Sequence, residues 1–251
     1  MAPLFKREKE EIWTGEFIQT EVADFHSHIL PGVDDGSSSL EITGEMLDAE
    51  IEQKIGTVVA TPHFYPKEES PVTFLKRREK AIETLKSAGR TAPTIYVGAE
   101  VAYFPGIGIS EEMPSLCIRG TRTLLLEMPF RHWNDDTVRE VVEMRDRKQL
   151  FVVLAHVERF LGYRNLRALE YFAQEGVFLQ CNAEAFLDKR TQKDAMKLWE
   201  CGMVALLGTD AHNLTHRKPN LGYALQKLGG GERLNQVERF GKMLLKGAIP
   251  L

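Results

Sequence analysis

Histidine and carboxylate side chains recur along this chain in patterns that suit metal binding. The richest segment, D-F-H-S-H-I-L-P-G-V-D-D-G from Asp24 to Gly36, supplies His26, His28 and Asp35. Six more candidates each stand where an apolar run ends, and these are His63, Glu100, Glu127, His156, Asp210 and His212. Neutral imidazoles and carboxylates together suit Zn, Mn or Fe. Nine candidates exceed the needs of one ion and predict a cluster of two or three.

The spacing within the first and last motifs strengthens this interpretation. His26 and His28 are two residues apart on an expected strand, so both side chains point to one face. The same holds for Asp210 and His212 in L-L-G-T-D-A-H. A single histidine such as His63 could equally be a hydrogen-bonded core residue, and the prediction therefore rests on the whole set.

Seven short apolar runs along the chain are the elements that must position these side chains. They are continuous and rich in β-branched residues, which is typical of parallel strands buried on both faces. The expected strands are Val22–Phe25, Thr57–Thr61, Thr94–Val97, Thr123–Leu126, Phe151–Ala155, Val177–Gln180 and Val204–Leu207.

Helical patterns separate most of these runs. Ser38-x-x-Glu41 predicts a capping box at the start of the first helix, and Pro71 is expected to open the second. Asp135 or Asp136 is expected to cap the third. Further apolar stripes predict helices around 166–172, 198–199 and 237–244.

The strand–helix alternation predicts an α/β fold, either a closed barrel or a doubly wound sheet. An open sheet concentrates ligands at one switch point, whereas six of the seven strands here deliver a candidate ligand at the carboxyl end. A closed barrel gathers every strand end around one mouth. We therefore expect one barrel domain of about seven strands over residues 21–251, preceded by an N-terminal appendage of residues 1–20.

Composition excludes several classes of function. The chain has 251 residues and a net charge of −4, and it carries no basic footprint for nucleic acid. No apolar run suits a membrane span or a signal peptide. The three cysteines, Cys117, Cys181 and Cys201, are not paired in C-x-x-C motifs. Reduced thiols fit the cytoplasm, and none of the three has the arginine six residues later that a cysteine-dependent tyrosine phosphatase needs.

The ordered motifs resemble those of a known family. H-x-H, an aspartate nine residues after the first histidine, T-P-H, two strand-end glutamates, a strand-end histidine and G-x-D-x-H resemble the PHP (polymerase and histidinol phosphatase) superfamily. The segments H-S-H-I-L-P-G-V-D-D-G, A-T-P-H, A-H-V-E-R and G-T-D-A-H are most similar to its manganese-dependent protein-tyrosine phosphatases from bacterial capsule and exopolysaccharide loci. The resemblance runs from about Asp24 to Arg217. It implies a distorted (β/α)7 TIM-like barrel, the PHP fold, with three metals.

The resemblance also implies roles for single residues. One ion would be held by His26, His28, Glu100 and Asp210; a second by Glu100, Glu127 and His156, with Glu100 bridging; a third by Asp35, His63 and His212. Arg159 and Arg217 stand where the family has arginines that contact phosphate. Val157 and Phe64 depart from the proline and the second histidine that are common in relatives.

These residues predict a metal-dependent phosphoester hydrolase acting on phosphotyrosine. By resemblance, its partner is an autophosphorylated tyrosine kinase of capsule or exopolysaccharide synthesis, and manganese is the favoured cofactor, with Fe, Zn or Co as alternatives. His63 is the nearest candidate for a proton donor if its metal is weakly held. A small-molecule phosphatase such as histidinol-phosphate phosphatase stays open as a second hypothesis, and a non-catalytic PHP interaction module as a third.

Overall fold

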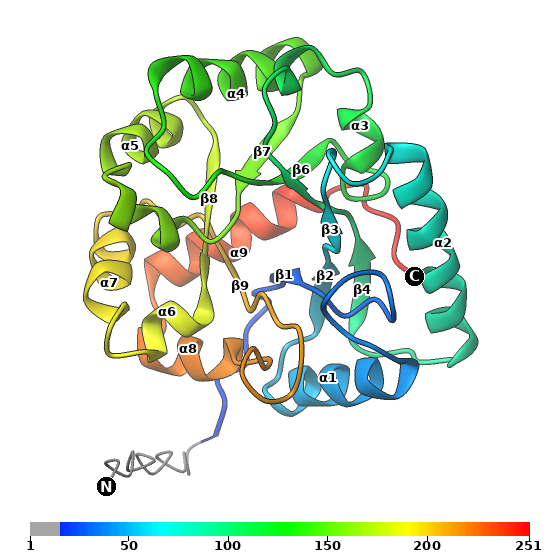
Figure 1. Ribbon diagram of the computed structural model, residues 1–251. Coiled ribbons are helices and arrows are strands. Elements are labelled where there is room, and N and C mark those ends of the chain that lie inside the picture. The colour runs from blue at the N-terminus through cyan, green and yellow to red at the C-terminus, as the bar shows by residue number, and fades with distance from the viewer. Residues whose placement is uncertain (1–15) are drawn as a thin grey trace, which may run out of the picture.

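A computed structural model describes residues 16–251 of the chain, which form one ring of parallel strands with helices around it (Figure 1). Each strand is short, as the lengths of the apolar runs predict. The strands are β1 (Asp24–Ser27), β2 (Thr57–Ala60), β3 (His63–Phe64), β4 (Thr94–Val97), β5 (Glu100–Ala102), β6 (Thr123–Glu127), β7 (Phe151–Leu154), β8 (Phe178–Asn182) and β9 (Leu206–Gly208).

The strands pair in two groups, with orders β1-β2-β4 and β3-β5-β6-β7-β8-β9, and all neighbours are parallel. A single bridge between Ser27 and Ala211 brings β1 beside the end of β9. The strands β2 and β3 follow one another across Thr61-Pro62, and β4 and β5 across Gly98-Ala99. The result is a curled parallel sheet in an α/β domain, in agreement with the expected fold class.

Helices cover the outside of this ring. They are α1 (Leu40–Glu52), α2 (Pro71–Ser87), α3 (Met113–Leu116), α4 (Asp135–Lys148), α5 (Leu166–Gln174), α6 (Ala183–Leu187), α7 (Gln192–Glu200), α8 (Leu221–Leu228) and α9 (Glu232–Leu244). Two short 3-10 helices, η1 (Ile107–Ile109) and η2 (Val157–Tyr163), lie in strand–helix connections.

Two helix starts differ from the sequence prediction by one residue. The N-cap of α1 is Ser39, whose hydroxyl accepts a hydrogen bond from the Ile42 amide, and not Ser38. The N-cap of α4 is Asn134 rather than Asp135 or Asp136. In both cases neighbouring residues are good caps, so sequence alone does not separate them. Pro71 opens α2 as predicted.

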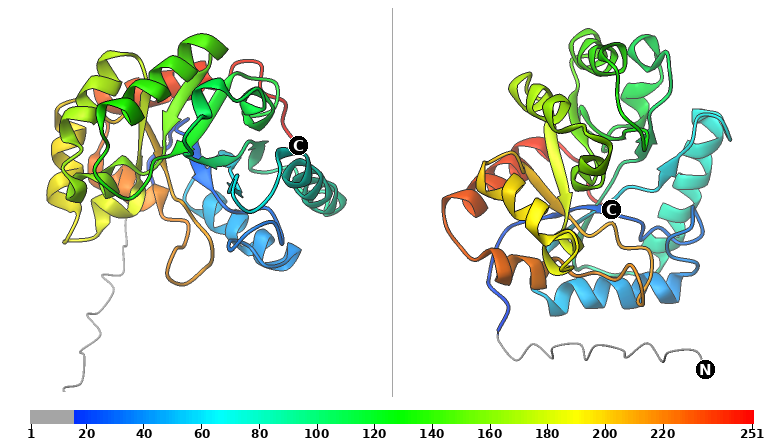
Figure 2. Two further views of the ribbon diagram at one scale, coloured as in Figure 1. Left: turned by 45° about the horizontal axis from the view of Figure 1, so that its top comes forward. Right: turned by 60° about the vertical axis from the view of Figure 1, so that its left-hand side comes forward.

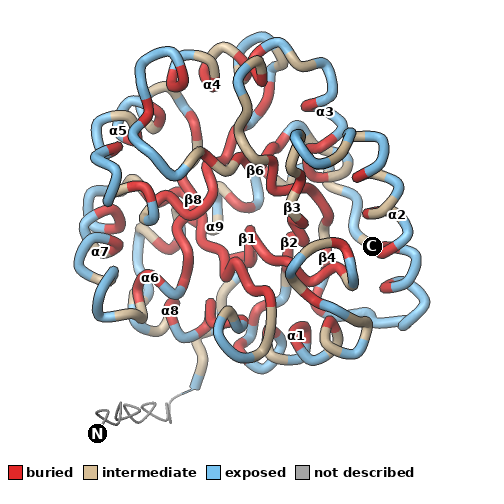
Figure 3. Tube along the Cα trace, viewed as in Figure 1, coloured by how far each residue is buried: buried red, intermediate tan, exposed pale blue. Residues whose placement is uncertain are grey.

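Both faces of the strands are buried, as their continuous apolar sequences predict (Figure 3). Alternate residues pack against the helices in one large cluster. The others, among them Phe25, Val59, Leu125 and Val153, form a second cluster that includes Leu244 of α9. Helix α9 lies behind the strands in Figure 1, and these contacts place it against their amino ends.

Part of the expected N-terminal appendage lies outside the described residues, namely 1–15. The remainder packs on the domain: the Phe17 ring contacts Tyr223 of α8 edge-on at 5.0 Å, and Thr20 donates a hydrogen bond to Glu238 of α9 at 2.6 Å. Figure 2 shows this segment leaving the domain beside α8. Within residues 16–251, no helix is both long and apolar enough to cross a lipid bilayer.

Candidate metal centre

The nine side chains singled out in the sequence meet at the carboxyl ends of the strands. Sheet register accounts for part of this, because His63 of β3 is paired with Glu100 of β5, and Ala102 of β5 with Glu127 of β6. Six of the nine are almost completely buried, namely His26, His28, Glu100, His156, Asp210 and His212. Such burial of polar groups requires partners.

Glu100 lies at the middle of the cluster. Its Oε2 atom is 3.2 Å from His26 Nε2, 3.3 Å from His28 Nε2 and 2.9 Å from His63 Nδ1. Its other oxygen, Oε1, is 3.0 Å from His156 Nε2. One carboxylate therefore faces four imidazoles, which is the position a bridging ligand must take.

The remaining candidates lie on either side of Glu100. Glu127 Oε1 is 3.2 Å from His156 Nε2. On the opposite side, Asp35 Oδ1 lies 3.6 Å from His63 Nε2 and 3.4 Å from His212 Nε2. Asp35 differs from the rest because 69% of its side chain is exposed.

Three groups of these residues have donor atoms within 4.8 Å of one another: His28, Asp35, His63 and His212; His26, His28 and Asp210; and His63, Glu100 and Glu127. The grouping overlaps the ligand sets implied by resemblance without repeating them. It adds His28 to the set around Asp35, and it joins His63 rather than His156 to Glu127.

Three buried donor atoms in the cluster test whether metal ions fit here. Glu100 Oε2, His63 Nδ1 and His212 Nε2 make no hydrogen bond within residues 16–251, and their ion-pair contacts are with other candidate ligands only. Two donors bound tetrahedrally at about 2.1 Å from one ion are about 3.4 Å apart. Most of the imidazole–carboxylate distances above fall between 2.9 and 3.6 Å. The donor set and its spacing therefore fit divalent metals with nitrogen and oxygen ligands.

Two histidines of the cluster have raised pKa values when no metal is bound. Burial lowers the pKa of His156, but hydrogen bonds to Glu100 and Glu127 outweigh it and raise that pKa to about 9. Burial likewise opposes a proton on His28, yet Asp210, Asp34 and Glu100 bring its pKa well above the ordinary value. Protonated imidazoles therefore balance the carboxylates, and metal ions must displace those protons.

His212 behaves in the opposite way. Burial, reinforced by the positive charge of His28, lowers the pKa of His212 to about 4. Its imidazole is therefore neutral near pH 7, which is the form that binds a metal.

Backbone geometry around the cluster explains the glycines of two motifs. A Cβ on Gly36 would lie 2.2 Å from the His28 carbonyl oxygen, and one on Gly208 would lie 2.6 Å from His26 Cβ. Two proposed ligands, His156 and Asp210, have positive φ angles of 35° and 53°. Residues other than glycine rarely adopt this left-handed backbone conformation, and backbone strain of this kind is common at functional sites.

Both arginines named from the sequence converge on one proposed ligand. Arg159 Nη2 donates to Asp210 Oδ2 at 2.7 Å, and Arg217 Nη2 to Asp210 Oδ1 at 2.5 Å. About a third of each arginine side chain stays exposed, so both can also face a bound anion. Asn182 donates to Asp210 Oδ2 at 3.0 Å.

Sequence reasoning missed two residues that hold the ligands in place. Asp34 Oδ2 is 2.7 Å from His28 Nδ1 and also accepts the His63 amide at 2.9 Å. Gln180 Oε1 accepts the His156 amide at 2.8 Å and lies 3.2 Å from His26 Nδ1. Such partners fix ring orientation. The doubled aspartate of V-D-D-G could have indicated Asp34, and the position of Gln180 at the end of the expected strand Val177–Gln180 could have indicated that residue.

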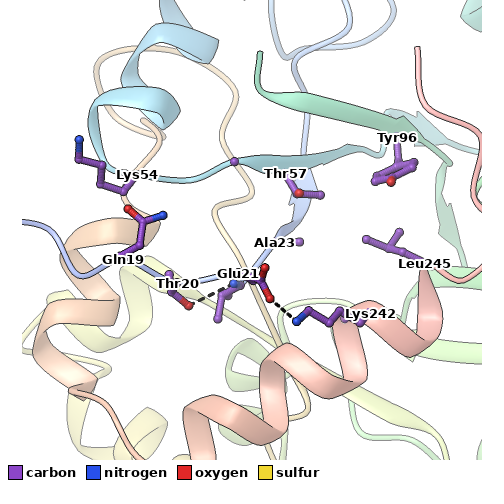
Figure 4. A pocket seen from close by; sticks show the side chains of 12 residues that line it. Gln19, Thr20, Glu21, Ala23, Lys54, Thr57, Tyr96, Lys242 and Leu245 are labelled. Atoms are coloured by element: carbon purple, nitrogen blue, oxygen red, sulfur yellow. Dashed lines mark hydrogen bonds and ion pairs between the residues drawn. The ribbon is translucent and has the colours of Figure 1, made fainter. Parts of the chain in front are cut away.

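A hollow of about 450 Å³ lies at the opposite end of the strands from the metal centre (Figure 4). Thr57 and Tyr96 line it together with Glu21 and Lys242, which form an ion pair. It contains no group of potential metal ligands. In the part of the chain that the structure describes, none of the three cysteines belongs to a group of potential metal ligands, and burial raises the pKa of the Cys117 thiol to about 12 and that of Cys181 well above its ordinary value.

Comparison with known proteins assigns the family. Residues 22–239 match the family model described as capsular polysaccharide synthesis, CpsB/CapC. The chain belongs to the CpsB/CapC family. The match covers every proposed metal ligand and both arginines.

Individual CpsB/CapC proteins are similar over most of their length. Tyrosine-protein phosphatase YwqE of Bacillus subtilis is 26% identical over 238 residues, covering 89% of this chain and 91% of that protein. Tyrosine-protein phosphatase CpsB of Streptococcus pneumoniae is 26% identical over 212 residues, covering 78% and 85%.

A solved structure supports the fold of this CpsB/CapC chain. It comes from work on YwqE of Bacillus subtilis and CpsB of Streptococcus pneumoniae, which are described there as unique metal-dependent tyrosine phosphatases. It superposes with a TM-score of 0.76 at 23% identity, covering 92% of this chain and 96% of that one.

Proposed function

We propose that this chain is a metal-dependent, non-cysteine phosphatase that hydrolyses phosphotyrosine in proteins. The observation that carries the proposal is the buried cluster around Glu100, whose imidazole and carboxylate donor atoms have the spacing of metal ligands. Membership of the CpsB/CapC family, and the phosphatase names of its relatives, support the same chemistry.

We assign the ligands to two or three divalent ions, with manganese favoured. His26, His28, Glu100 and Asp210 would hold one ion. Glu100, Glu127 and His156 would hold a second, and Asp35, His63 and His212 a third. When bound, adjacent ions lower the pKa of a coordinated water and polarise phosphoryl oxygens.

The protein's own contribution is positioning and charge. Arg159 and Arg217 present guanidinium groups that neutralise the equatorial phosphoryl oxygens, for which their planar fork is suited. Asn182 and the two arginines hold Asp210, while Asp34 fixes the ring of His28. His63, whose side chain is 10% exposed, is the candidate proton donor to the leaving group if its metal is weakly held.

The leaving group favours an aryl substrate. A phenol has a pKa near 10, lower than that of an alkyl alcohol, so its departure depends less on a proton donor. We propose as the physiological substrate an autophosphorylated tyrosine kinase of capsule or exopolysaccharide synthesis, met in the cytoplasm. Histidinol phosphate, an alkyl ester, is the alternative substrate to exclude.

We also propose that the nine short strands act as seven barrel positions, with β2–β3 and β4–β5 each being one interrupted strand. Their succession along the chain and the Ser27–Ala211 bridge support this distorted (β/α)7 arrangement. The division into an appendage of residues 1–20 and a barrel of residues 21–251 remains part of the same proposal.

The test is a substrate panel on manganese-loaded protein. We expect kcat/KM for a phosphotyrosine peptide to exceed that for the matching phosphoserine peptide and for histidinol phosphate. A chelator should abolish the activity, and added manganese should restore it. A clear preference for histidinol phosphate would favour the alternative.

A further inference from the structure

Two exposed aromatic side chains stand beside the metal centre on separate loops. Phe130 follows β6, the strand that carries Glu127, and 47% of it is exposed. Tyr163 ends η2, the short helix that begins after His156, and 40% of it is exposed. Their ring centroids are 6.5 Å apart, with the rings nearly edge to face. Neighbouring exposed aromatic side chains beside a functional site indicate a surface that binds a ligand or a partner.

The two loops are fastened to each other by a buried residue. Asn165 is 1% exposed; its Oδ1 accepts the Trp133 amide at 3.0 Å and its Nδ2 donates to the Arg131 carbonyl at 2.9 Å. The His132 ring also lies 3.2 Å from the Tyr163 carbonyl oxygen. The positions of Phe130 and Tyr163 are therefore set before any ligand arrives, which reduces the entropy lost on binding.

Phe130 lies directly against a proposed metal ligand. Its ring stacks on His156 at 5.9 Å with 19° between the planes, and it also contacts Phe160 at 5.2 Å. His156 Nε2 is in turn within 3.2 Å of both Glu100 and Glu127. An apolar surface thus begins one ring away from the place where the phosphoryl group is proposed to bind.

The chemistry of the substrate matches this arrangement. In phosphotyrosine the phenyl ring follows the phosphoryl group after a single ester oxygen, so a phosphoryl group at the metals brings the ring to the edge of the site. We propose that Phe130, supported by Tyr163, forms the wall that binds the phenyl ring of the substrate. This inference rests on the proposed phosphotyrosine phosphatase function and names the residue that distinguishes aryl from alkyl phosphates.

The test compares a ligand that has a ring with one that lacks it. Phe130→Ala should raise KM for a phosphotyrosine peptide about 3- to 10-fold, as expected for the loss of one aromatic pair. The inhibition constant of inorganic phosphate, measured on the same manganese-loaded protein, should stay within 2-fold of wild type, roughly the error of such a comparison. Phe130→Tyr keeps an aromatic ring and should have the KM of the wild type.

Two further variants keep the test decisive. Phe130→Leu retains apolar volume without a ring and should still raise KM, and it replaces the alanine variant if that variant does not fold. Tyr171→Ala removes an exposed aromatic side chain from helix α5 and should leave both constants unchanged.

The outcomes separate this inference from the function on which it rests. A wild-type protein that does not hydrolyse the phosphotyrosine peptide would overturn the proposed function itself. An active wild type with unchanged KM in Phe130→Ala and Phe130→Leu would overturn the aromatic wall alone. Parallel increases in KM and in the phosphate inhibition constant would show that Phe130 merely supports His156, and this too would overturn the inference.

Discussion

The two ends of the strand ring are built on opposite principles. At the amino end, Leu244 and its neighbours on α9 pack against strand side chains, and the Thr123 hydroxyl donates to the Leu244 carbonyl at 2.7 Å. At the carboxyl end, five histidines and four carboxylates meet, and three of their buried donor atoms, Glu100 Oε2, His63 Nδ1 and His212 Nε2, make no hydrogen bond to any described residue. The amino end stabilises the domain by burying apolar surface. The carboxyl end instead gathers imidazoles and carboxylates, whose charges bound metal ions would balance.

The contrast extends to the backbone. The carboxyl end places His156 and Asp210 in the left-handed region, a conformation that costs about 1 kcal/mol or more for each residue. Ligands that bind only the folded state add stability by mass action. The metal centre should therefore support the fold as well as the chemistry, whereas the amino end should support the fold alone.

The largest expected effect concerns the centre of the cluster. Glu100→Ala removes the carboxylate that faces four imidazoles, and we expect turnover to fall by about 1,000-fold or more, since metal position as well as metal binding is lost. Asp35→Ala removes a mostly exposed ligand on one side and should cost about 10- to 100-fold. Steady-state kinetics on manganese-loaded proteins measure both. Equal losses would contradict the central role of Glu100.

A smaller loss is expected when the arginines are removed. Arg159→Ala and Arg217→Ala should each lower kcat/KM by about 100- to 1,000-fold, as does the removal of a single group that stabilises charge in the transition state. Neither is a proposed ligand, so metal content should stay largely intact. Arg190→Ala, an exposed arginine paired with Asp188, is the matched control. Parallel loss of metal would contradict this expectation and show that metal binding needs the hydrogen bonds of the arginines to Asp210.

Metal binding at the carboxyl end should depend on pH. The pKa of His156 in the metal-free protein is about 9, so below pH 9 an ion must displace its proton. Apparent metal affinity should rise about tenfold per pH unit from pH 6 towards 9 for each proton displaced. Calorimetry in buffers of different ionisation enthalpy measures this release. Metal binding without proton release would show that these histidines are already neutral.

The amino end provides the smallest expected effect on catalysis. Leu244→Ala opens a cavity in the second core cluster and should lower the free energy of unfolding by about 2–5 kcal/mol. Turnover of the folded, metal-loaded protein should match wild type. Denaturant unfolding and kinetics at a temperature where the variant is folded test both halves. A fall in kcat comparable to that of the arginine variants would mean that the two ends are coupled.

The sequence predicts the buried strands well because their apolar runs are continuous. The continuations of two strands are harder to predict. Pro62 and Gly98 interrupt the apolar pattern before β3 and β5, and these strands have only two and three residues. The N-caps of α1 and α4 were misplaced by one residue because serine, asparagine and aspartate compete at those positions.

Candidate ligands could be named from the sequence because they follow strands, and parallel strands end on one side. Contacts across the ring could not. Gln180 ends the expected strand Val177–Gln180, but a carboxamide is neither an imidazole nor a carboxylate and was not a candidate ligand; it nevertheless contacts both His26 and His156. The convergence of Arg159 and Arg217 on Asp210 likewise depends on loop conformation, which no periodicity predicts.

The central claim is that the carboxyl end holds a cluster of metal ions on which hydrolysis depends. Elemental analysis of manganese-loaded wild type and Glu100→Ala, with phosphotyrosine peptide turnover measured on the same samples, tests it most directly. We predict two or three ions per wild-type chain, and the loss of both ions and turnover in the variant. Fewer than one ion per chain in a wild-type sample that is fully active would contradict the account.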